Sequence, residues 1–214
     1  IFWIVSWKKR AAVFIVLSLF FIIPTRRWIN YTPTKKETPN LKIISLNGKS
    51  GKFGDENIYN FLNDQKADVV LTQEYKSAEN LKGFEYFERN FPVVKIQSRF
   101  PIVESGIVET DAKNGRCIYA DIKINGKIIR FVNVYMEPFY LDKSMVKPTK
   151  DMNVNEEKAK NIIHKLVPTF RKHQSQIAPI KGFLDSSPYP IILAGDFNSV
   201  PNSYEYYTLS ENLE

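Results

Sequence analysis

The segment 190–201 constrains the fold of this chain more than any other stretch. Its apolar run, 191–194, is too short for a helix and is bounded by proline, so it predicts a short buried strand. Gly195 permits a sharp bend or a close approach of the backbone where that strand ends. Asp196 and Asn198 follow two residues apart, so in an extended chain their side chains point the same way.

A carboxylate beside an amide at the end of a strand suits a phosphate ester and a hydrated metal ion. The Asp196 carboxylate can take a proton from water or bind a cation, and the Asn198 amide can hold an oxygen in place. An Asx turn after a strand is the purely structural alternative for these two residues.

Cysteine and histidine content excludes several kinds of site. The single cysteine, Cys117, excludes an internal disulfide and any cysteine-rich metal site. Both histidines, His164 and His173, lie in one long helical pattern, which favours ordinary helix residues over catalytic ones. A serine or cysteine hydrolase is excluded, because no histidine is placed near Cys117 and no nucleophile elbow is present.

The net charge of +7 belongs almost entirely to the N-terminal segment. Residues 1–38 hold seven basic residues and one acidic residue, a balance of +6, whereas residues 39–214 hold 23 basic and 22 acidic residues. The nearly neutral remainder argues against a basic domain that grips a nucleic-acid backbone. Basic residues next to an apolar run instead favour a position beside a membrane.

The apolar run at 11–23 predicts a membrane anchor within residues 1–28, formed by the end of one apolar segment and a helix at 11–24. Such a helix covers only about 20 Å of the roughly 30 Å hydrocarbon core, so flanking residues such as Arg26 and Arg27 would have to extend it. A signal peptide is the rival, but no small-residue cleavage site follows. Flanking basic clusters argue against a core helix of a soluble protein.

The anchor also predicts where the rest of the chain lies. Residues 1–7 are expected to end an earlier membrane segment, and the basic loop 8–10 is expected in the cytoplasm. The domain would then lie on the outer, periplasmic or extracellular, side of the cytoplasmic membrane. A polar linker at 29–40 is expected to precede a domain at 41–214.

Alternating and periodic patterns predict the elements of this domain. Helices are expected at 57–65, at 155–184 and from Ser203 onward. Asn125-Gly126 is a strong signal for a hairpin turn. The expected strands are 41–46, 67–74, a pair at 91–96 and 102–108, a hairpin of 117–124 with 127–135, and 191–194.

Four of these strands end in polar residues. If the strands share one core, their ends can converge on one rim, which is a site-like pattern; chance polar strand ends are the alternative. The residues concerned are Asn47, Gln73 with Glu74, Tyr135, and Asp196 with Asn198.

Five motifs together resemble the endonuclease/exonuclease/phosphatase superfamily over about residues 41–214, and the anchored arrangement resembles members common in Bacteroidetes-type bacteria. The resemblance implies an α/β fold, a four-layer α/β sandwich of the DNase I-like kind, with two packed mixed β-sheets flanked by helices and preceded by the membrane helix. The motifs, in this order, are 41–47, 67–74, 98–102, 133–135 and 195–198.

The resemblance also implies roles for five residues. Glu74 would bind Mg²⁺ or Mn²⁺, and Asn47 would position Glu74 or touch the metal shell. Asp196 would orient and deprotonate the attacking water, and Asn198 would hold a non-bridging phosphate oxygen. Tyr135 would hydrogen-bond the phosphate, as in exonuclease III-like members, where many relatives have histidine.

The chain departs from the family pattern at its C-terminus. The family closes with an aspartate–histidine pair, which is not present up to Glu214, so we expect a chain truncated at both ends with its C-terminal strands missing. The chain alone is therefore expected to hydrolyse little, and missing strands would leave an unpaired sheet edge and apolar surface exposed.

The resemblance implies a metal-dependent phosphoester hydrolase tethered to a membrane, either a nuclease or a phosphodiesterase or phosphatase. A non-catalytic phosphate- or partner-binding domain that retains the fold is the alternative. The substrate could be nucleic acid, a phospholipid headgroup or a sugar phosphate, and no obligate protein partner is inferred.

Overall fold

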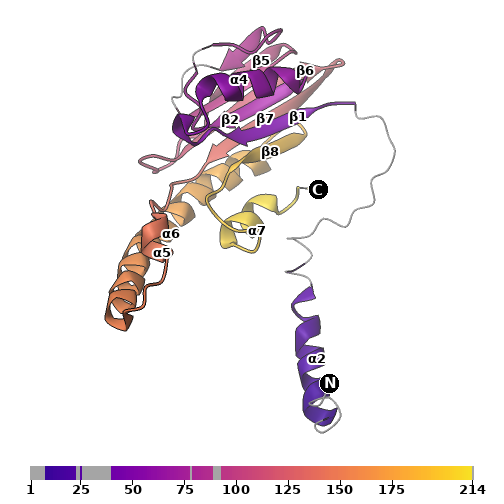
Figure 1. Ribbon diagram of the computed structural model, residues 1–214. Coiled ribbons are helices and arrows are strands. Elements are labelled where there is room, and N and C mark those ends of the chain that lie inside the picture. The colour runs from indigo at the N-terminus through magenta and orange to yellow at the C-terminus, as the bar shows by residue number, and fades with distance from the viewer. Residues whose placement is uncertain (1–7, 23–24, 26–39, 78, 89–92, 214) are drawn as a thin grey trace.

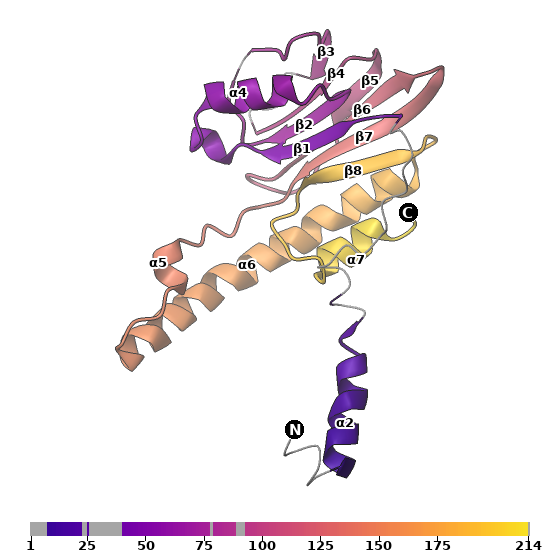
Figure 2. The same ribbon diagram turned by 45° about the vertical axis from the view of Figure 1, so that its right-hand side comes forward.

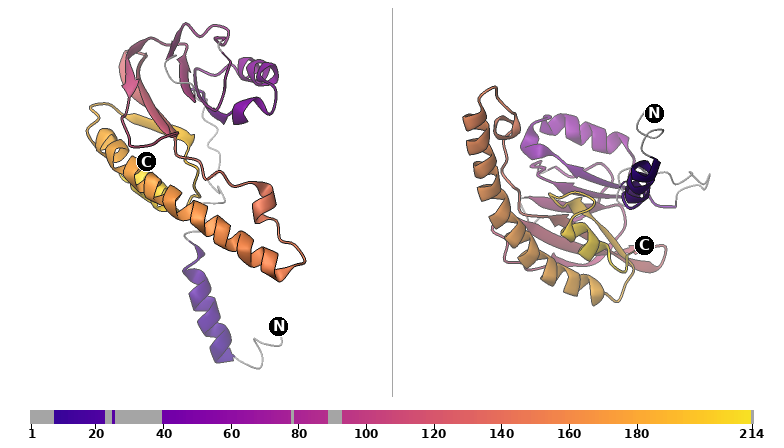
Figure 3. Two further views of the ribbon diagram at one scale, coloured as in Figure 1. Left: turned by 90° about the vertical axis from the view of Figure 1, so that its left-hand side faces the viewer. Right: turned by 90° about the horizontal axis from the view of Figure 1, so that it is seen from below.

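The structure, a computed structural model, describes residues 8–22, 25, 40–77, 79–88 and 93–213. Two four-stranded mixed sheets form the domain, with strand orders β1-β2-β4-β3 and β5-β6-β7-β8. The sheets pack face to face, with helices on the outer face of each (Figure 1). Turned views place α4 (Asp55–Asp64) and α6 (Met152–Asp185) on opposite sides of the two sheets (Figure 3).

The first sheet contains the first of two parallel strand pairs that position the site. β1 (Ile43–Asn47) lies parallel to β2 (Val69–Gln73), and the connection between them contains the 3-10 turn η1 (Lys49–Gly51) and helix α4 (Asp55–Asp64). β4 (Val94–Ser98) runs antiparallel to both β2 and the short β3 (Tyr86–Glu88). All five residues of β2 are buried, as expected for a central strand covered on both faces.

The second sheet contains the other parallel pair. β5 (Ile102–Ile107) pairs with β6 (Arg116–Ile124), which forms the predicted hairpin with β7 (Lys127–Tyr135). Asn125 and Gly126 make the turn with φ values of 50° and 82°, the left-handed conformations that a type I′ turn needs. β8 (Ile191–Asp196) joins β7 in parallel after a crossover through α5 (Lys143–Val146) and α6 (Met152–Asp185), and α7 (Tyr204–Ser210) follows.

The main core lies between the sheets and fixes how they face each other. Smaller apolar clusters fill the space between each sheet and its helices, under α4 and under α6 with α7. The buried side chains between the sheets come from strands of both and include Val69, Leu71, Ile96, Ile118, Ile122 and Phe131.

The predicted pairing of 91–96 with 102–108 is wrong. β4 belongs to the first sheet and β5 to the second, so these neighbouring strands do not pair with each other. The short segment around Arg99 and Pro101 carries the chain across, and the Arg99 Nε donates to the carbonyl of Ala67 at 2.8 Å. β4 pairs with β2 over five residues, and β5 pairs with β6 across a register shift between Ile102 and Glu104.

The predicted membrane helix is not shown. At its position the structure has α2 (Lys8–Leu19), a helix of 12 residues. Among the residues described, no helix combines the length and the apolar character needed to cross a bilayer. The apolar segment expected at 1–7 and most of the linker expected at 29–40 lie outside the described residues.

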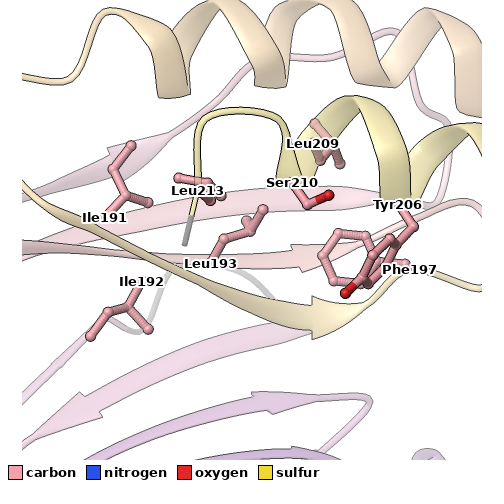
Figure 4. A pocket seen from close by; sticks show the side chains of 8 residues that line it. All are labelled: Ile191, Ile192, Leu193, Phe197, Tyr206, Leu209, Ser210 and Leu213. Carbon is pink, nitrogen blue, oxygen red and sulfur yellow. The ribbon is translucent and has the colours of Figure 1, made fainter. Parts of the chain in front are cut away.

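β8 forms one edge of the second sheet among the described strands, and all six of its residues are half-buried. Beside it lies a groove of about 660 Å³ (Figure 4). In this groove Leu193 of β8 faces Leu209 and Leu213 from the α7 segment. The groove is lined by Ile191, Ile192, Leu193, Phe197, Tyr206, Leu209, Ser210 and Leu213.

Gly195 is required by the close contact between β7 and β8. Its φ is 145°, and a Cβ atom there would lie 2.7 Å from the amide nitrogen of Val134 and collide with the Val134 carbonyl. We expect Gly195→Ala to lower the free energy of unfolding by about 3 kcal/mol. Gly126→Ala is the matched control, because its φ is also positive but nothing lies within 4 Å. Urea denaturation of both variants checks this, and equal losses would contradict it.

Candidate active site

The five residues predicted for the site lie together at one rim of the domain. Asn47 ends β1 and Glu74 follows β2, whereas Tyr135 ends β7 and Asp196 ends β8, with Asn198 just beyond. The strands within each pair run parallel, so the polar residues at their C-terminal ends lie at the same end of the sheet. We call these five residues the polar cluster.

Asn47 connects the two sheets. Its Nδ2 lies 3.0 Å from Glu74 Oε1 and 2.6 Å from Asp196 Oδ2, so one amide nitrogen donates to both carboxylates. Its Oδ1 accepts from the Lys49 amide at 2.7 Å, which fixes the orientation of the side-chain amide. The two carboxylates, 122 positions apart along the sequence and from different sheets, are therefore held beside each other.

Glu74 is held in its ionised form by its neighbours. Besides Asn47, the Tyr135 hydroxyl and the Ser50 hydroxyl each donate to its carboxylate at 3.0 Å. Burial raises the pKa of Glu74, but the hydrogen bonds from Asn47, Ser50 and Tyr135 together outweigh burial and leave the pKa below its ordinary value. Glu74 is therefore negatively charged at neutral pH.

Tyr135 acts as a hydrogen-bond donor in this arrangement. Its side chain is buried, and burial together with the negative charge of Glu74 holds the pKa of Tyr135 well above its ordinary value. The phenol consequently keeps its proton and donates a hydrogen bond to Glu74. In this structure it orients the carboxylate of Glu74 and does not stand free for a phosphate.

Asp196 is oriented by hydrogen bonds to both of its oxygens. Oδ2 accepts from Asn47, and Oδ1 accepts from the backbone amide of Asn198 at 2.9 Å. The latter bond is the Asx turn that the sequence offered as an alternative, so the turn and the polar cluster occur together. Asn198 Nδ2 also donates to the Met136 carbonyl at 2.9 Å, which ties the loop after β8 to the end of β7.

Two members of the polar cluster have strained backbones. Glu74 and Asn198 have φ values of 50° and 45°, in the left-handed region that residues other than glycine rarely adopt. The Ser50 amide donates to the Glu74 carbonyl at 2.9 Å, which helps to hold this conformation. Both side chains are thereby turned out of the strand direction toward the rim.

A buried amide pair, whose pairing the sequence did not indicate, lies between the sheets beneath the rim. Gln73 Nε2 donates to Asn133 Oδ1 at 2.6 Å, across the space between the sheets. Asn133 Nδ2 donates to the carbonyls of Thr72 and Lys95, both at 3.0 Å. The available signal was Asn133 itself, a polar residue that shares the inward face of β7 with the core residues Ile129 and Phe131.

A second buried network holds the chain that follows Tyr135. The Glu137 carboxylate accepts from the backbone and side chain of Asn114 and from Lys172. Burial raises the pKa of Glu137, but the Asn114 donors, with Lys172 and others, lower it overall. His173 is fully buried, with Nδ1 2.9 Å from Glu205 and Nε2 2.6 Å from the Glu137 carbonyl. His173 is thus a structural residue of α6, whereas His164 is exposed.

The donor set fits a hard cation. The described residues contain no group of three or more histidine, cysteine, aspartate or glutamate side chains that could hold a metal ion. Mg²⁺, however, is commonly held by one or two carboxylates, with water and substrate phosphate as its other ligands. The ionised Glu74, with three hydrogen bonds and a further lone pair on its carboxylate, suits this kind of binding.

The fold is shared with several solved structures, all less than 25% identical in sequence. Sphingomyelinase C from Streptomyces griseocarneus is 20% identical, with a TM-score of 0.52 over 81% of this chain and 70% of that one. A humanized D. rerio TDP2 is 17% identical, with a TM-score of 0.53 over 75% and 67%. A double mutant of beta toxin from Staphylococcus aureus with bound magnesium ions is 16% identical, with a TM-score of 0.52 over 82% and 70%.

Sequence comparison identifies the family. No curated protein matches the chain in a sequence search. Residues 45–214 match the pattern of the Endonuclease/Exonuclease/phosphatase family, which confirms the resemblance inferred from the five motifs. With this match, the two mixed sheets and the shared fold, the chain belongs to the endonuclease/exonuclease/phosphatase family.

Proposed function

We propose that this protein is a Mg²⁺- or Mn²⁺-dependent phosphoester hydrolase and that the polar cluster is its active site. The observation that carries the proposal is the Asn47 amide, which holds the carboxylates of Glu74 and Asp196 side by side. Family membership supports hydrolysis of phosphoesters in general. Sphingomyelinase C and TDP2, which share the fold, and the magnesium bound in beta toxin agree with this class of chemistry.

Each carboxylate has one task in this proposal. Glu74 would hold the metal, which neutralises negative charge on the phosphoryl group and the leaving oxygen when it is bound. Asp196 accepts a hydrogen bond from the attacking water and takes its proton, since its own position is fixed by Asn47 and the Asn198 amide.

The remaining residues of the cluster orient these groups and the substrate. One N–H of the Asn198 side chain is bonded to Met136, which leaves its other N–H to hold a non-bridging phosphate oxygen. Tyr135 fixes Glu74, and it can contact phosphate only by exchanging that bond. Asn47 sets the separation of the two carboxylates.

We also propose, from the sequence alone, that residues 1–28 tether the domain to a membrane on its outer side. The basic residues at 8–10 and the apolar run that follows support this.

The dependence on metal tests this proposal. In the longest natural polypeptide that contains this chain, we expect EDTA to reduce hydrolysis of bis(p-nitrophenyl) phosphate by about 100-fold or more, and Mg²⁺ to restore it. Turnover that is indifferent to EDTA would contradict the proposal. Metal binding without turnover of any phosphoester would instead favour the non-catalytic binding domain.

A further inference from the structure

A cavity of about 460 Å³ opens directly beside the polar cluster, and its walls are mostly apolar. Asp196 and Asn198 line one side of it. Phe139 and Phe170, which also line it, form an edge-to-face pair with ring centroids 5.0 Å apart. The other lining residues are Leu166, Ser199, Val200 and Ser203. A phosphate at the polar cluster would therefore place one of its ester groups against a largely apolar surface.

The apolar wall continues along α6 as an exposed stripe. Phe170 is 44% exposed, and Val167, Ile163 and Met152 are 45%, 58% and 80% exposed. At 100° per residue, these four positions fall within about 60° of one another around the helix. We call them the apolar stripe. It begins at Phe170 in the cavity wall and runs toward the N-terminal end of α6, where the exposed Glu156, paired with Lys160, interrupts it before Met152.

The stripe lies on a part of the domain that projects from the sheets. α5 and the first half of α6 extend together beyond the sheet edges (Figure 2). Residues 144–175, which we call the arm, contain seven basic and three acidic residues, a net charge of +4. The remainder of residues 39–214 contains 16 basic and 19 acidic residues, a net charge of −3. Charge is thus unevenly distributed over the nearly neutral domain, and the net positive charge lies on the arm.

An apolar stripe on a positively charged helix fits an anionic lipid surface. Amphipathic helices of this kind lie in the bilayer interface, with the apolar face among the acyl chains and basic residues near the headgroups. Single-stranded nucleic acid would instead require exposed aromatic side chains as stacking platforms. Three of the four residues in the stripe, Met152, Ile163 and Val167, are aliphatic and offer no such platform.

We propose that the arm docks on the surface of an anionic phospholipid bilayer and that the cavity receives the apolar part of a membrane phospholipid, whose phosphoester lies at the polar cluster. This inference rests on the proposed hydrolase function, and it narrows the substrate to phospholipids. The water oxygen bonds to the phosphorus of that ester as Asp196 takes one proton from the water, the bond between phosphorus and the ester oxygen breaks, and that oxygen takes a proton from solvent while Asp196 returns its own to solvent.

Site-specific fluorescence tests the docking step. The native Cys117 is only 1% exposed, so a new surface cysteine can be labelled selectively with an environment-sensitive dye. Ile163→Cys places the dye on the stripe, and Val103→Cys is the matched control on β5, since these side chains are 58% and 57% exposed. Each labelled chain is mixed with vesicles of phosphatidylglycerol and phosphatidylcholine, with pure phosphatidylcholine vesicles, or with a single-stranded oligonucleotide.

We expect a blue shift of the dye at 163 with the anionic vesicles, reduced by high salt and by omitting phosphatidylglycerol, and no shift at 103. Equal responses at both positions, or none, would overturn the docking surface. A response at 163 to the oligonucleotide but not to vesicles would overturn it in favour of nucleic acid. A shift that grows with protein concentration alone would overturn it in favour of self-association.

Hydrolysis is measured separately, so that the two proposals can fail independently. The longest natural polypeptide that contains this chain is assayed on the same vesicles and on soluble bis(p-nitrophenyl) phosphate. Turnover of vesicle phospholipid supports the inference, whereas turnover of the soluble diester alone overturns the phospholipid assignment. If the dye at 163 responds to vesicles but neither substrate is hydrolysed, the proposed hydrolase function fails and the docking surface stands.

Discussion

Replacing Asp196 with asparagine is expected to reduce phosphodiester turnover by about 10²–10⁴-fold. Asparagine keeps the size of the side chain and one oxygen for the Asn198 amide, but it cannot take a proton from water. The loss should therefore appear in kcat, beside a decrease of about 1 kcal/mol in the free energy of unfolding from the lost Asn47 bond to Oδ2. Steady-state kinetics and urea denaturation of the same preparation measure both quantities.

Asp185→Asn is the matched control for this variant. Asp185 is an exposed residue at the end of α6, paired with Lys181 and remote from the polar cluster. Its replacement should leave kcat unchanged. If Asp196→Asn kept wild-type turnover, Asp196 would not be the proton acceptor, and the chemistry would have to be assigned to another group.

Glu74→Gln is expected to reduce turnover by about 10²–10³-fold and to weaken metal binding. The single side-chain oxygen of glutamine can still accept from Asn47 and Tyr135, and its amide nitrogen can donate to the Ser50 hydroxyl, but glutamine lacks the negative charge that attracts the cation. Because the loss arises from metal affinity, part of the activity should return at high Mn²⁺ concentration. Activity measured over a range of Mn²⁺ concentrations distinguishes weakened metal binding from a loss of folding.

Glu79→Gln is the control for this change, because Glu79 is exposed and follows Glu74 by five positions. It should match the wild type at every metal concentration. A Glu74→Gln variant whose metal dependence was also unchanged would show that the cation binds elsewhere, even if its activity were low.

Local patterns predicted much of the fold. The Asn125-Gly126 turn fixed the hairpin of β6 and β7, because few other sequences adopt two consecutive left-handed residues easily. The short apolar runs before Glu74 and Asp196 predicted β2 and β8, since each ends in residues that a core strand would not tolerate. The polar residues at these strand ends also predicted the polar cluster, because the C-terminal ends of neighbouring parallel strands lie at one rim.

Features that depend on contacts between distant segments could not be predicted in this way. Which sheet β4 and β5 each join depends on the strands available to pair with them. The turn-like sequence at Pro101 is compatible with β4 and β5 pairing with each other or belonging to different sheets. The double hydrogen bond of Asn47 and the buried pair of Gln73 with Asn133 likewise require the two sheets to be packed first. Residue types alone do not specify such pairings.

Binding of Mn²⁺ to this chain, followed by electron paramagnetic resonance, tests the central claim most directly. The account predicts that the wild type and Asp185→Asn bind one Mn²⁺ ion with the same affinity, and that Glu74→Gln binds it at least about tenfold more weakly. Wild-type protein that binds no Mn²⁺, or a Glu74→Gln variant that binds it as tightly as the wild type, would contradict the assignment of this rim as a metal-dependent hydrolytic site.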